Sequence, residues 1–241
     1  MLEAAGAIPI AFPLLEIQPN ANPSAATTQL QAAKQADSVI FVSPNAVQFA
    51  HNLQPLPWPR STRTRIAAIG TATANALHDL GECVDVMPSQ DASSSEGLLA
   101  LSAFRAVAGK HISIVCGDRG RQALAHTLID RGASVTQVEV YRSRTPEYDS
   151  KQQFVIFGEK KPQVICITSN QGILNLVRIM DDRFKSQVTA LPLIVNSGRC
   201  SKLARELGFS GTITVAHQPG DQGQLEGIQR WLATSNFNQS E

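Results

Sequence analysis

Aromatic residues, charged residues and long apolar runs are all scarce in this chain of 241 residues. Aromatic side chains make up 5% of the sequence and charged side chains 17%, and the net charge is only +1. Such a balance excludes a strong electrostatic field for nucleic acid or an anionic membrane surface. No apolar run approaches the length of a transmembrane helix, and Glu3 stands where a signal peptide would carry basic residues. We therefore expect neither a membrane span nor a secretory leader.

Motifs for metals, nucleotides and disulfides are also missing. The four cysteines, Cys83, Cys116, Cys166 and Cys200, form no C-x-x-C pair, and we expect them to be reduced residues of a cytoplasmic protein. The five histidines lack the spacing of metal ligands. No G-x-G-x-x-G and no P-loop follows a strand candidate, so no nucleotide cofactor is expected.

What the chain does contain is an internal repeat. The segment 39–46 returns as 165–172, about 126 residues later, and the pair Gly6-Ala7 returns as Gly132-Ala133. A period of this size indicates two copies of one α/β domain rather than a solenoid. A hydrophobic content of 43% is typical of a globular protein with two ordinary cores. The cleft expected between two such lobes is the first place to look for a site.

Short apolar runs alternate with helical patterns along the chain. The expected strands are 8–10, 39–42, 66–69, 84–86, 112–115, 135–140, 164–167, 193–195 and 213–215. The expected helices are 26–35, 45–53, 72–80, 95–107, 120–131, 170–183, 199–207 and 223–233. Nearly continuous apolar strands are typical of parallel sheets covered on both faces. We predict two flavodoxin-like, doubly wound domains with strand order 2-1-3-4-5. The glycines at 81, 132 and 208 are expected to end helices in the left-handed conformation.

Two equivalent segments, 12–19 and 139–146, run on from strands and end in proline. They predict a pair of linker strands. One domain is then contiguous, over 18–138, and the other is discontinuous, joining 1–12 to 146–241.

The repeat also predicts that one strand and most of one helix are absent before Met1. The second copy begins near Lys110 with the strand 112–115, and the equivalent of that strand would precede the chain start. In the expected order this strand lies near the centre of the sheet, so its loss leaves neighbouring backbone groups unpaired. We expect the chain to be less stable and less active without it.

Candidate binding residues lie where the expected strands end, because ligands of parallel α/β sheets bind at that edge. These loops carry hydroxyls, amides and glycines at helix N-termini, which suit carboxylate or phosphate. The candidates are Ser43, Asn45, Gly70, Thr71, Thr73, Gly117, Ser169, Asn170, Ser197 and Gly198. The alternative for Ser43, Thr71, Ser169 and Ser197 is that they are only helix N-caps.

Tyr141, one of two tyrosines, lies in the second expected linker. A tyrosine can protonate a leaving group and still be uncharged near neutral pH, so Tyr141 is a candidate general acid. The alternative is a packed aromatic side chain.

Taken together, the ordered segments resemble the uroporphyrinogen-III synthase family. The segments that carry the resemblance are 12–17, 39–46, 66–74, 138–142 and 165–169, and it extends from Leu2 to about Leu232. It implies two flavodoxin-like domains, a monomer without cofactor, and hydroxymethylbilane as the substrate. It also implies a lyase reaction in haem biosynthesis, which closes the macrocycle with inversion of the last ring.

Residue by residue, Tyr141 matches the family's linker tyrosine, the candidate acid for the departing hydroxyl. Thr73 matches the threonine of a Gly-x-x-Thr loop, and Ser43 and Ser169 match the serines that end two strands. Ser197 and Gly198 fall in the second copy of the Gly-x-x-Thr loop.

The chain departs from the family pattern at three places. Arg199-Cys200 replaces a threonine, Cys116 replaces an arginine, and the N-terminal strand is missing. Two other functions remain open: a non-catalytic two-lobe protein that binds a polyanion, and an inactive module with the synthase fold.

Overall fold

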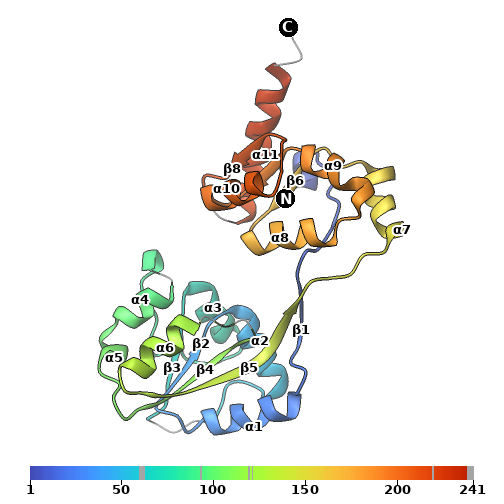
Figure 1. Ribbon diagram of the computed structural model, residues 1–241. Coiled ribbons are helices and arrows are strands. Elements are labelled where there is room, and N and C mark those ends of the chain that lie inside the picture. The colour runs from blue at the N-terminus through green and yellow to red at the C-terminus, as the bar shows by residue number, and fades with distance from the viewer. Residues whose placement is uncertain (60–62, 93, 119, 121, 219, 238–241) are drawn as a thin grey trace. The chain divides into compact units, whose positions relative to one another are not determined.

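A computed structural model describes residues 1–59, 63–92, 94–118, 120, 122–218 and 220–237. The chain divides into two compact units (Figure 1). Unit 2 is Ile17–Arg144, and unit 1 joins Met1–Glu16 to Thr145–Glu241. The chain therefore passes between the units twice. Within the described residues, no helix is both long and apolar enough to cross a bilayer.

The sheet of unit 2 has the order β1-β5-β4-β2-β3. Its strands are β1 (Glu16–Pro19), β2 (Ser38–Phe41), β3 (Arg65–Ala68), β4 (His111–Gly117) and β5 (Ser134–Arg144). The pairs β2–β3, β2–β4 and β4–β5 are all parallel. Beyond β3, the expected strand 84–86 is reduced to a single parallel bridge between Val86 and Ala67.

The repeat explains this strand order. When the strands are counted from β4, where the second copy begins, the sheet reads β5, β4, β2, β3 and Val86 as 2-1-3-4-5. The flavodoxin-like order expected from the sequence is confirmed for this unit, in circularly permuted form.

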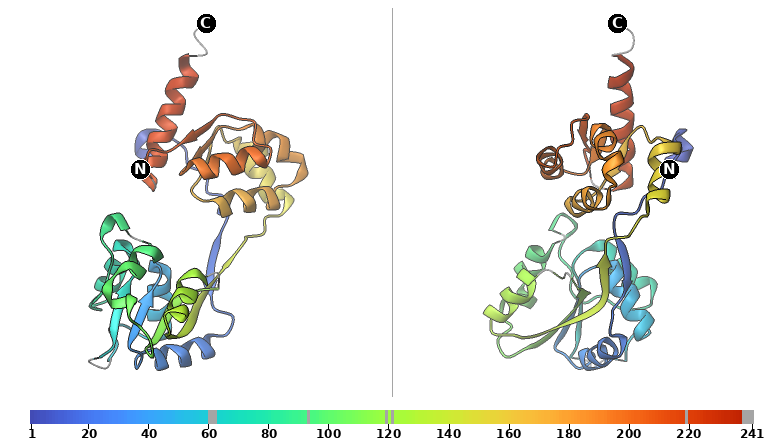
Figure 2. Two further views of the ribbon diagram at one scale, coloured as in Figure 1. Left: turned by 60° about the vertical axis from the view of Figure 1, so that its left-hand side comes forward. Right: turned by 45° about the vertical axis from the view of Figure 1, so that its right-hand side comes forward.

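Helices cover both faces of the unit 2 sheet, as Figure 2 shows. Leu30, Val47 and Leu77 belong to one buried cluster, and Leu98, Phe104 and Leu128 to the other. The first layer holds α1 (Pro23–Ala33), α2 (Pro44–Leu53) and α3 (Thr71–Asp79). The second layer holds η2 (Gln90–Ala92), α4 (Ser95–Ala100), α5 (Ser102–Arg105) and α6 (Gln122–Asp130). Strands covered on both faces are buried on both faces, which is why their sequences are almost wholly apolar.

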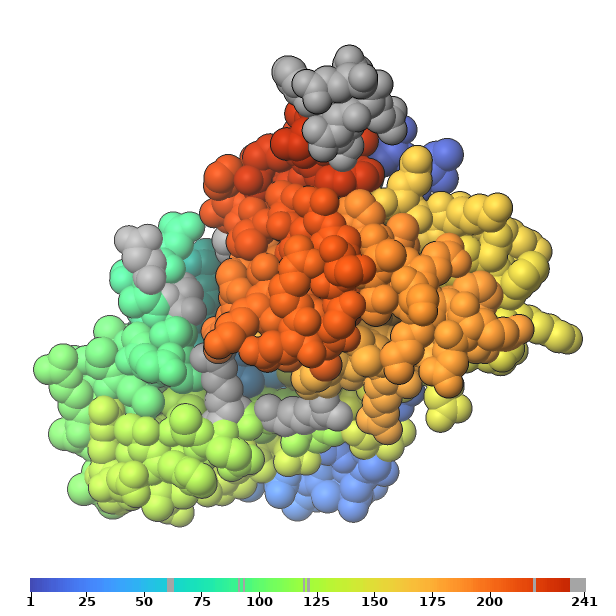
Figure 3. Space-filling view, turned by 45° about the horizontal axis from the view of Figure 1, so that its top comes forward, coloured from blue at the N-terminus to red at the C-terminus, as the bar shows by residue number. Residues whose placement is uncertain are grey.

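Unit 1 contains a smaller parallel sheet of order β6-β7-β8. The strands are β6 (Ile165–Ile167), β7 (Leu193–Val195) and β8 (Ile213–Val215). The helical elements are η1 (Glu3–Ala5), α7 (Ser150–Gln153), the π-helix η3 (Phe154–Lys160), α8 (Asn170–Ile179), α9 (Asp182–Ala190), α10 (Gly198–Glu206) and α11 (Asp221–Phe237). The segments from α8 to α11, orange to red in Figure 3, form one continuous surface.

The N-terminal segment is bound to unit 1 through Phe12, Pro13 and Leu14. The Phe12 ring lies 4.2 Å from the ring of Tyr148, whose hydroxyl donates to the Pro13 carbonyl at 2.8 Å. Asn175 donates to the carbonyl of Leu14 at 2.6 Å. These contacts keep residues 12–14 against the core of the unit.

The expected strand 8–10 was wrong. Residues 7–10 form no ladder, and Ile8 is 91% exposed. A strand needs a neighbour to accept its backbone hydrogen bonds, and the sheet of unit 1 ends at β6 on one side. The apolar run therefore belongs to no sheet.

Two helices that were expected to be continuous are each divided into two in the structure. The helix 95–107 divides into α4 and α5 at Leu101, whose ψ of 146° is extended. The helix 170–183 ends at Ile179, and a second helix begins after Asp181, whose side chain caps it by accepting from the Arg183 N–H. The expected left-handed glycines are confirmed, with φ of 78°, 85° and 90° at Gly81, Gly132 and Gly208.

Candidate functional site

The parallel strands of unit 2 bring four candidate residues to one edge of the sheet. Ser43 follows β2, Gly70 follows β3, Gly117 ends β4, and Tyr141 lies in β5 opposite Gly117. All of these strands point the same way, so the four residues share the carboxyl edge, where ligands of such sheets bind.

Tyr141 is half-buried and is held by two contacts of its side chain. Its hydroxyl lies 3.3 Å from Oγ of Ser43, and its ring centroid lies 5.7 Å from that of Phe49 on α2. The hydroxyl therefore has a polar partner, while the ring packs against the apolar cluster of α1, α2 and α3.

A β-bulge aims the Tyr141 side chain toward α2. The register passes from Cys116–Glu139 directly to Gly117–Tyr141, which leaves Val140 as the extra residue of β5. Val140 and Tyr141 accordingly pack against the same cluster, although neighbours in a regular strand point to opposite faces. Bulges commonly redirect a side chain next to a site in this way.

Ser43 connects Tyr141 to the start of a helix. Its φ of −167° is extended, and its Oγ accepts the Ala46 N–H at 3.1 Å, so it is the N-cap of α2. Pro44 occupies the first turn of α2, where backbone nitrogens have no partner within the helix, so the missing N–H of proline costs no hydrogen bond. The positive end of the α2 dipole thus faces the Tyr141 hydroxyl and favours negative charge there.

The other candidates of unit 2 surround α2 and α3. Asn45 is exposed on the first turn of α2, and Gly70, not Thr71, is the N-cap of α3. Thr71 is half-buried as the first residue of α3. Thr73, one turn into the helix, is only 2% exposed. The structure brings Ser43, Gly117 and Tyr141 together and places Thr73 in the protein interior.

Unit 1 repeats the same arrangement at its own carboxyl edge. Ser169 caps α8 by accepting the Gly172 N–H at 3.1 Å, and Ser197 caps α10 by accepting the Cys200 N–H at 3.3 Å. Asn170 contacts the Cys200 sulfur at 2.8 Å, which joins the two helix starts. Gly198 is exposed, and a Cβ there would meet nothing within 4 Å. Ser43, Ser169 and Ser197 are therefore all helix N-caps, and Thr71 is not.

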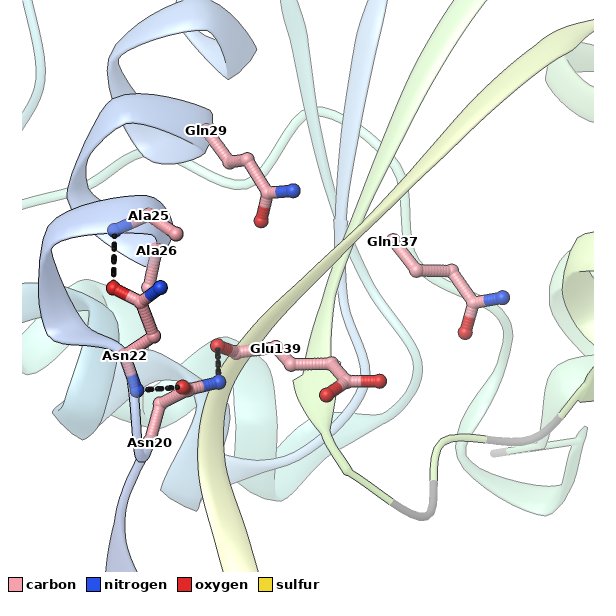
Figure 4. Close-up of a pocket in the computed structure, with 7 residues that line it drawn as sticks. All are labelled: Asn20, Asn22, Ala25, Ala26, Gln29, Gln137 and Glu139. Carbon is pink, nitrogen blue, oxygen red and sulfur yellow. Dashed lines mark hydrogen bonds between the residues drawn. The ribbon is translucent and has the colours of Figure 1, made fainter.

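A separate cavity of about 240 Å³ lies elsewhere in unit 2 (Figure 4). It is lined by Asn20, Asn22, Ala25, Ala26, Gln29, Gln137 and Glu139. Asn20 donates to the Glu139 carbonyl and accepts the Asn22 N–H, so these amides hold the start of α1 against β5. None of the predicted site residues lines it.

The cysteine beside Gly117 is unsuited to nucleophilic chemistry. Cys116 is 1% exposed, and burial, together with the carboxylates of Glu139 and Asp118, raises the pKa of its thiol to about 12. None of the four cysteines forms a disulfide.

This environment predicts a large difference in thiol reactivity. At about pH 8, a disulfide reagent should label the exposed Cys83 quickly and Cys116 only after unfolding in guanidinium, because the thiolate is the reactive form. Mass spectrometry of digested protein measures the labelling of each site. Equal labelling rates for Cys116 and Cys83 in the native protein would contradict the burial of β4.

Comparisons with a family model and with known sequences all lead to the same family. The family model of uroporphyrinogen-III synthase HemD matches residues 1–226. The uroporphyrinogen-III synthase of Escherichia coli is 32% identical over 232 residues, covering 95% of this chain and 93% of the relative. The enzyme of Salmonella typhimurium is 31% identical with the same coverage.

The chain belongs to the uroporphyrinogen-III synthase family. Solved structures agree at the level of the fold. A uroporphyrinogen III synthase mutant from Thermus thermophilus has a TM-score of 0.60 at 16% identity, covering 96% of this chain and 92% of that one. The Helicobacter pylori synthetase has a TM-score of 0.58 at 18% identity, with coverages of 92% and 90%. The family, the two-domain α/β fold and the cyclising lyase class predicted from the sequence are confirmed.

Two residues next to Tyr141 were not predicted from the sequence. Asp118 accepts the Ser143 N–H at 2.9 Å and binds Arg144 at 2.8 Å. Arg142 has a buried Nε without a hydrogen-bond partner among the described residues. Asp118 lies in one of the strand-end loops, but a carboxylate does not suit an anionic ligand, so it was not among the candidates. The only feature of the sequence that could have pointed to Arg142 is its position directly after Tyr141.

Proposed function

We propose that this chain converts hydroxymethylbilane into uroporphyrinogen III, with Tyr141 as the acid that protonates the departing hydroxyl. The observation that carries the role of Tyr141 is its hydroxyl contact with Ser43 at the carboxyl edge of the unit 2 sheet. The family match supports the reaction.

The proposed first step is the loss of water from the terminal hydroxymethyl group. The Tyr141 proton passes to the hydroxyl oxygen, the carbon–oxygen bond breaks with its electron pair, and the pyrrole nitrogen lone pair stabilises the electrophilic carbon. Ser43 stabilises the charge that forms on Tyr141, because its hydroxyl donates a hydrogen bond to the phenolate oxygen. The positive end of α2 favours the same charge.

Ring closure then depends mainly on how the substrate is held. The substituted carbon of the last ring attacks the electrophile, the spiro intermediate rearranges, and the ring that is turned over loses a proton, which restores Tyr141. Holding both ends of a linear molecule together converts a rare encounter into a frequent one. Acid–base chemistry and positioning suffice for these steps.

Helix starts supply the proposed contacts to the substrate carboxylates. The N-termini of α2, α3, α8 and α10 begin with Ser43, Gly70, Ser169 and Ser197. Backbone N–H groups at such positions bind anions without a dedicated cationic side chain. We include Asn45, Thr71, Gly117, Asn170 and Gly198 in the proposed binding surface because they belong to the same loops, and we leave out Thr73 because its side chain is buried.

We further propose that the enzyme acts as a monomer in the cytoplasm. The proposed domains are 18–138 and 1–12 with 146–241, with 12–19 and 139–146 as linkers. The division into units at Glu16 and Arg144 supports these linkers. Light scattering during gel filtration tests whether the protein is a monomer. Cell fractionation tests whether it is located in the cytoplasm.

The decisive assay supplies purified protein with freshly prepared hydroxymethylbilane and separates the oxidised porphyrin isomers. We expect the type III isomer to predominate over the type I isomer, which forms spontaneously. Heat-denatured protein is the matched control for the spontaneous reaction. Type I alone, at the rate of that control, would refute the proposed function.

A further inference from the structure

Asp118 bonds to the backbone on both sides of Tyr141. Its N–H donates to the Tyr141 carbonyl at 3.0 Å, and its Oδ1 accepts the Ser143 N–H at 2.9 Å. Its Oδ2 binds Nη1 of Arg144 at 2.8 Å. Asp118 thus holds β5 at three residues, Tyr141, Ser143 and Arg144.

The residue before Asp118 sets the place of the Tyr141 ring. Gly117 lies opposite Tyr141, and a Cβ on Gly117 would lie 2.6 Å from Cζ of Tyr141 and closer still to Cε2. Real Cβ atoms do not approach other atoms so closely, so only glycine at position 117 lets the ring lie over the end of β4.

These contacts act on a strand that is irregular at this point. The bulge takes Val140 out of the regular ladder between β4 and β5, although its carbonyl accepts the Asn20 N–H at 3.3 Å on the other side of β5. The bonds of Asp118 resume the connection directly after the bulge. On the β4 side of β5, Asp118 therefore holds the backbone of Tyr141 in place.

We propose that Asp118 is a positioning residue for Tyr141: it holds the bulged strand so that the phenol hydroxyl meets Ser43 and the departing hydroxyl of the substrate. The proposal rests on the function proposed above for Tyr141. Gly117 completes the arrangement by leaving room for the ring.

The chain contains a matched control at the other end of β4. The Asp37 N–H donates to the His111 carbonyl at 2.9 Å, and its Oδ2 accepts the His111 N–H at 2.9 Å. Its Oδ1 binds Nζ of Lys110 at 3.1 Å. Asp37 therefore makes the same three kinds of contact as Asp118, about 20 Å away along the strand and at the edge opposite Tyr141.

The experiment compares Asp118→Ala and Asp37→Ala, each alone and combined with Tyr141→Phe. We expect Asp118→Ala to lower kcat about 10-fold with little change in KM, since a small displacement of a reacting group lowers the rate steeply. Asp37→Ala should lower the thermal unfolding midpoint by about as much as Asp118→Ala does, and it should leave kcat unchanged. Asp118→Asn, which keeps an acceptor for the Ser143 N–H, should restore most of the rate.

The Tyr141→Phe background separates positioning from a general loss of structure. If Asp118 acts through the phenol, its replacement by alanine should change kcat less than twofold once the phenol is absent. If Asp118→Ala unfolds the protein, Gly117→Ala provides the same comparison, because the added methyl group displaces the ring.

Three results would overturn the proposal. Asp118→Ala with the kcat of Asp37→Ala would show that the contacts only stabilise the fold. An undiminished loss of rate in the Tyr141→Phe background would show that Asp118 acts independently of the phenol. Wild-type kcat for Tyr141→Phe alone would refute the role of Tyr141 itself, and Asp118 would then have no acid to position.

Discussion

Replacement of Tyr141 by phenylalanine is expected to lower kcat for ring closure about 100-fold, within the range that general acid catalysis supplies. The ring remains to pack on Phe49, and only the hydroxyl near Ser43 is lost. KM should therefore change little, because in the proposed mechanism the phenol acts on the departing hydroxyl rather than on the carboxylates. Steady-state assays of uroporphyrinogen III formation at several substrate concentrations separate the two constants.

The second tyrosine is the matched control for this change. The hydroxyl of Tyr148 donates to the Pro13 carbonyl in unit 1, and burial raises the pKa of this phenol above its usual value of 10. Tyr148→Phe also removes one phenol hydroxyl and should lower stability by about 1 kcal/mol, the usual worth of such a bond. Its kcat should equal that of the wild type. Equal losses of kcat in both variants would argue against a special role for Tyr141.

Replacement of Leu128 by alanine is expected to destabilise unit 2 by about 2–5 kcal/mol. Leu128 is 0% exposed and belongs to the cluster between the sheet and α6. Its removal leaves a cavity that rigid neighbours fill only in part. Urea denaturation followed by circular dichroism measures the change in the free energy of unfolding.

The neighbouring residue on α6 provides the control. Ile129 is 51% exposed, so Ile129→Ala should change the free energy of unfolding by only about 0.5 kcal/mol. Similar losses for Leu128→Ala and Ile129→Ala would show that α6 does not pack as described.

The fold could be predicted largely because its signals are local and occur twice. Apolar runs identify the strands, Ser43, Ser169 and Ser197 identify helix starts, and the repeat identifies equivalent strands. The helix break at Asp181 escaped prediction because the apolar pattern continues through it, while the capping contact with the Arg183 N–H decides the break.

Pairing partners could not be predicted from local signals. Residues 8–10 have the composition of a strand, but they do not pair with β6, β7 or β8 and so form no strand. The site shows the same limit. The strand-end rule leads to Ser43 and Gly117, whereas the contacts of Asp118 with β5 arise from a bulge that no sequence pattern announces.

The strand order of unit 2 also bears on the origin of the chain. β4 and β5 come from the second copy of the repeat, while β2, β3 and Val86 come from the first. A gene cut at the boundary of the copies would therefore encode two incomplete halves of this sheet, neither with a closed core. This is the pattern of a domain-swapped pair joined into one polypeptide. A single-copy ancestor with the same sheet would have had to exchange strands with a second molecule, and gene duplication would then have joined the two exchanged copies in one polypeptide.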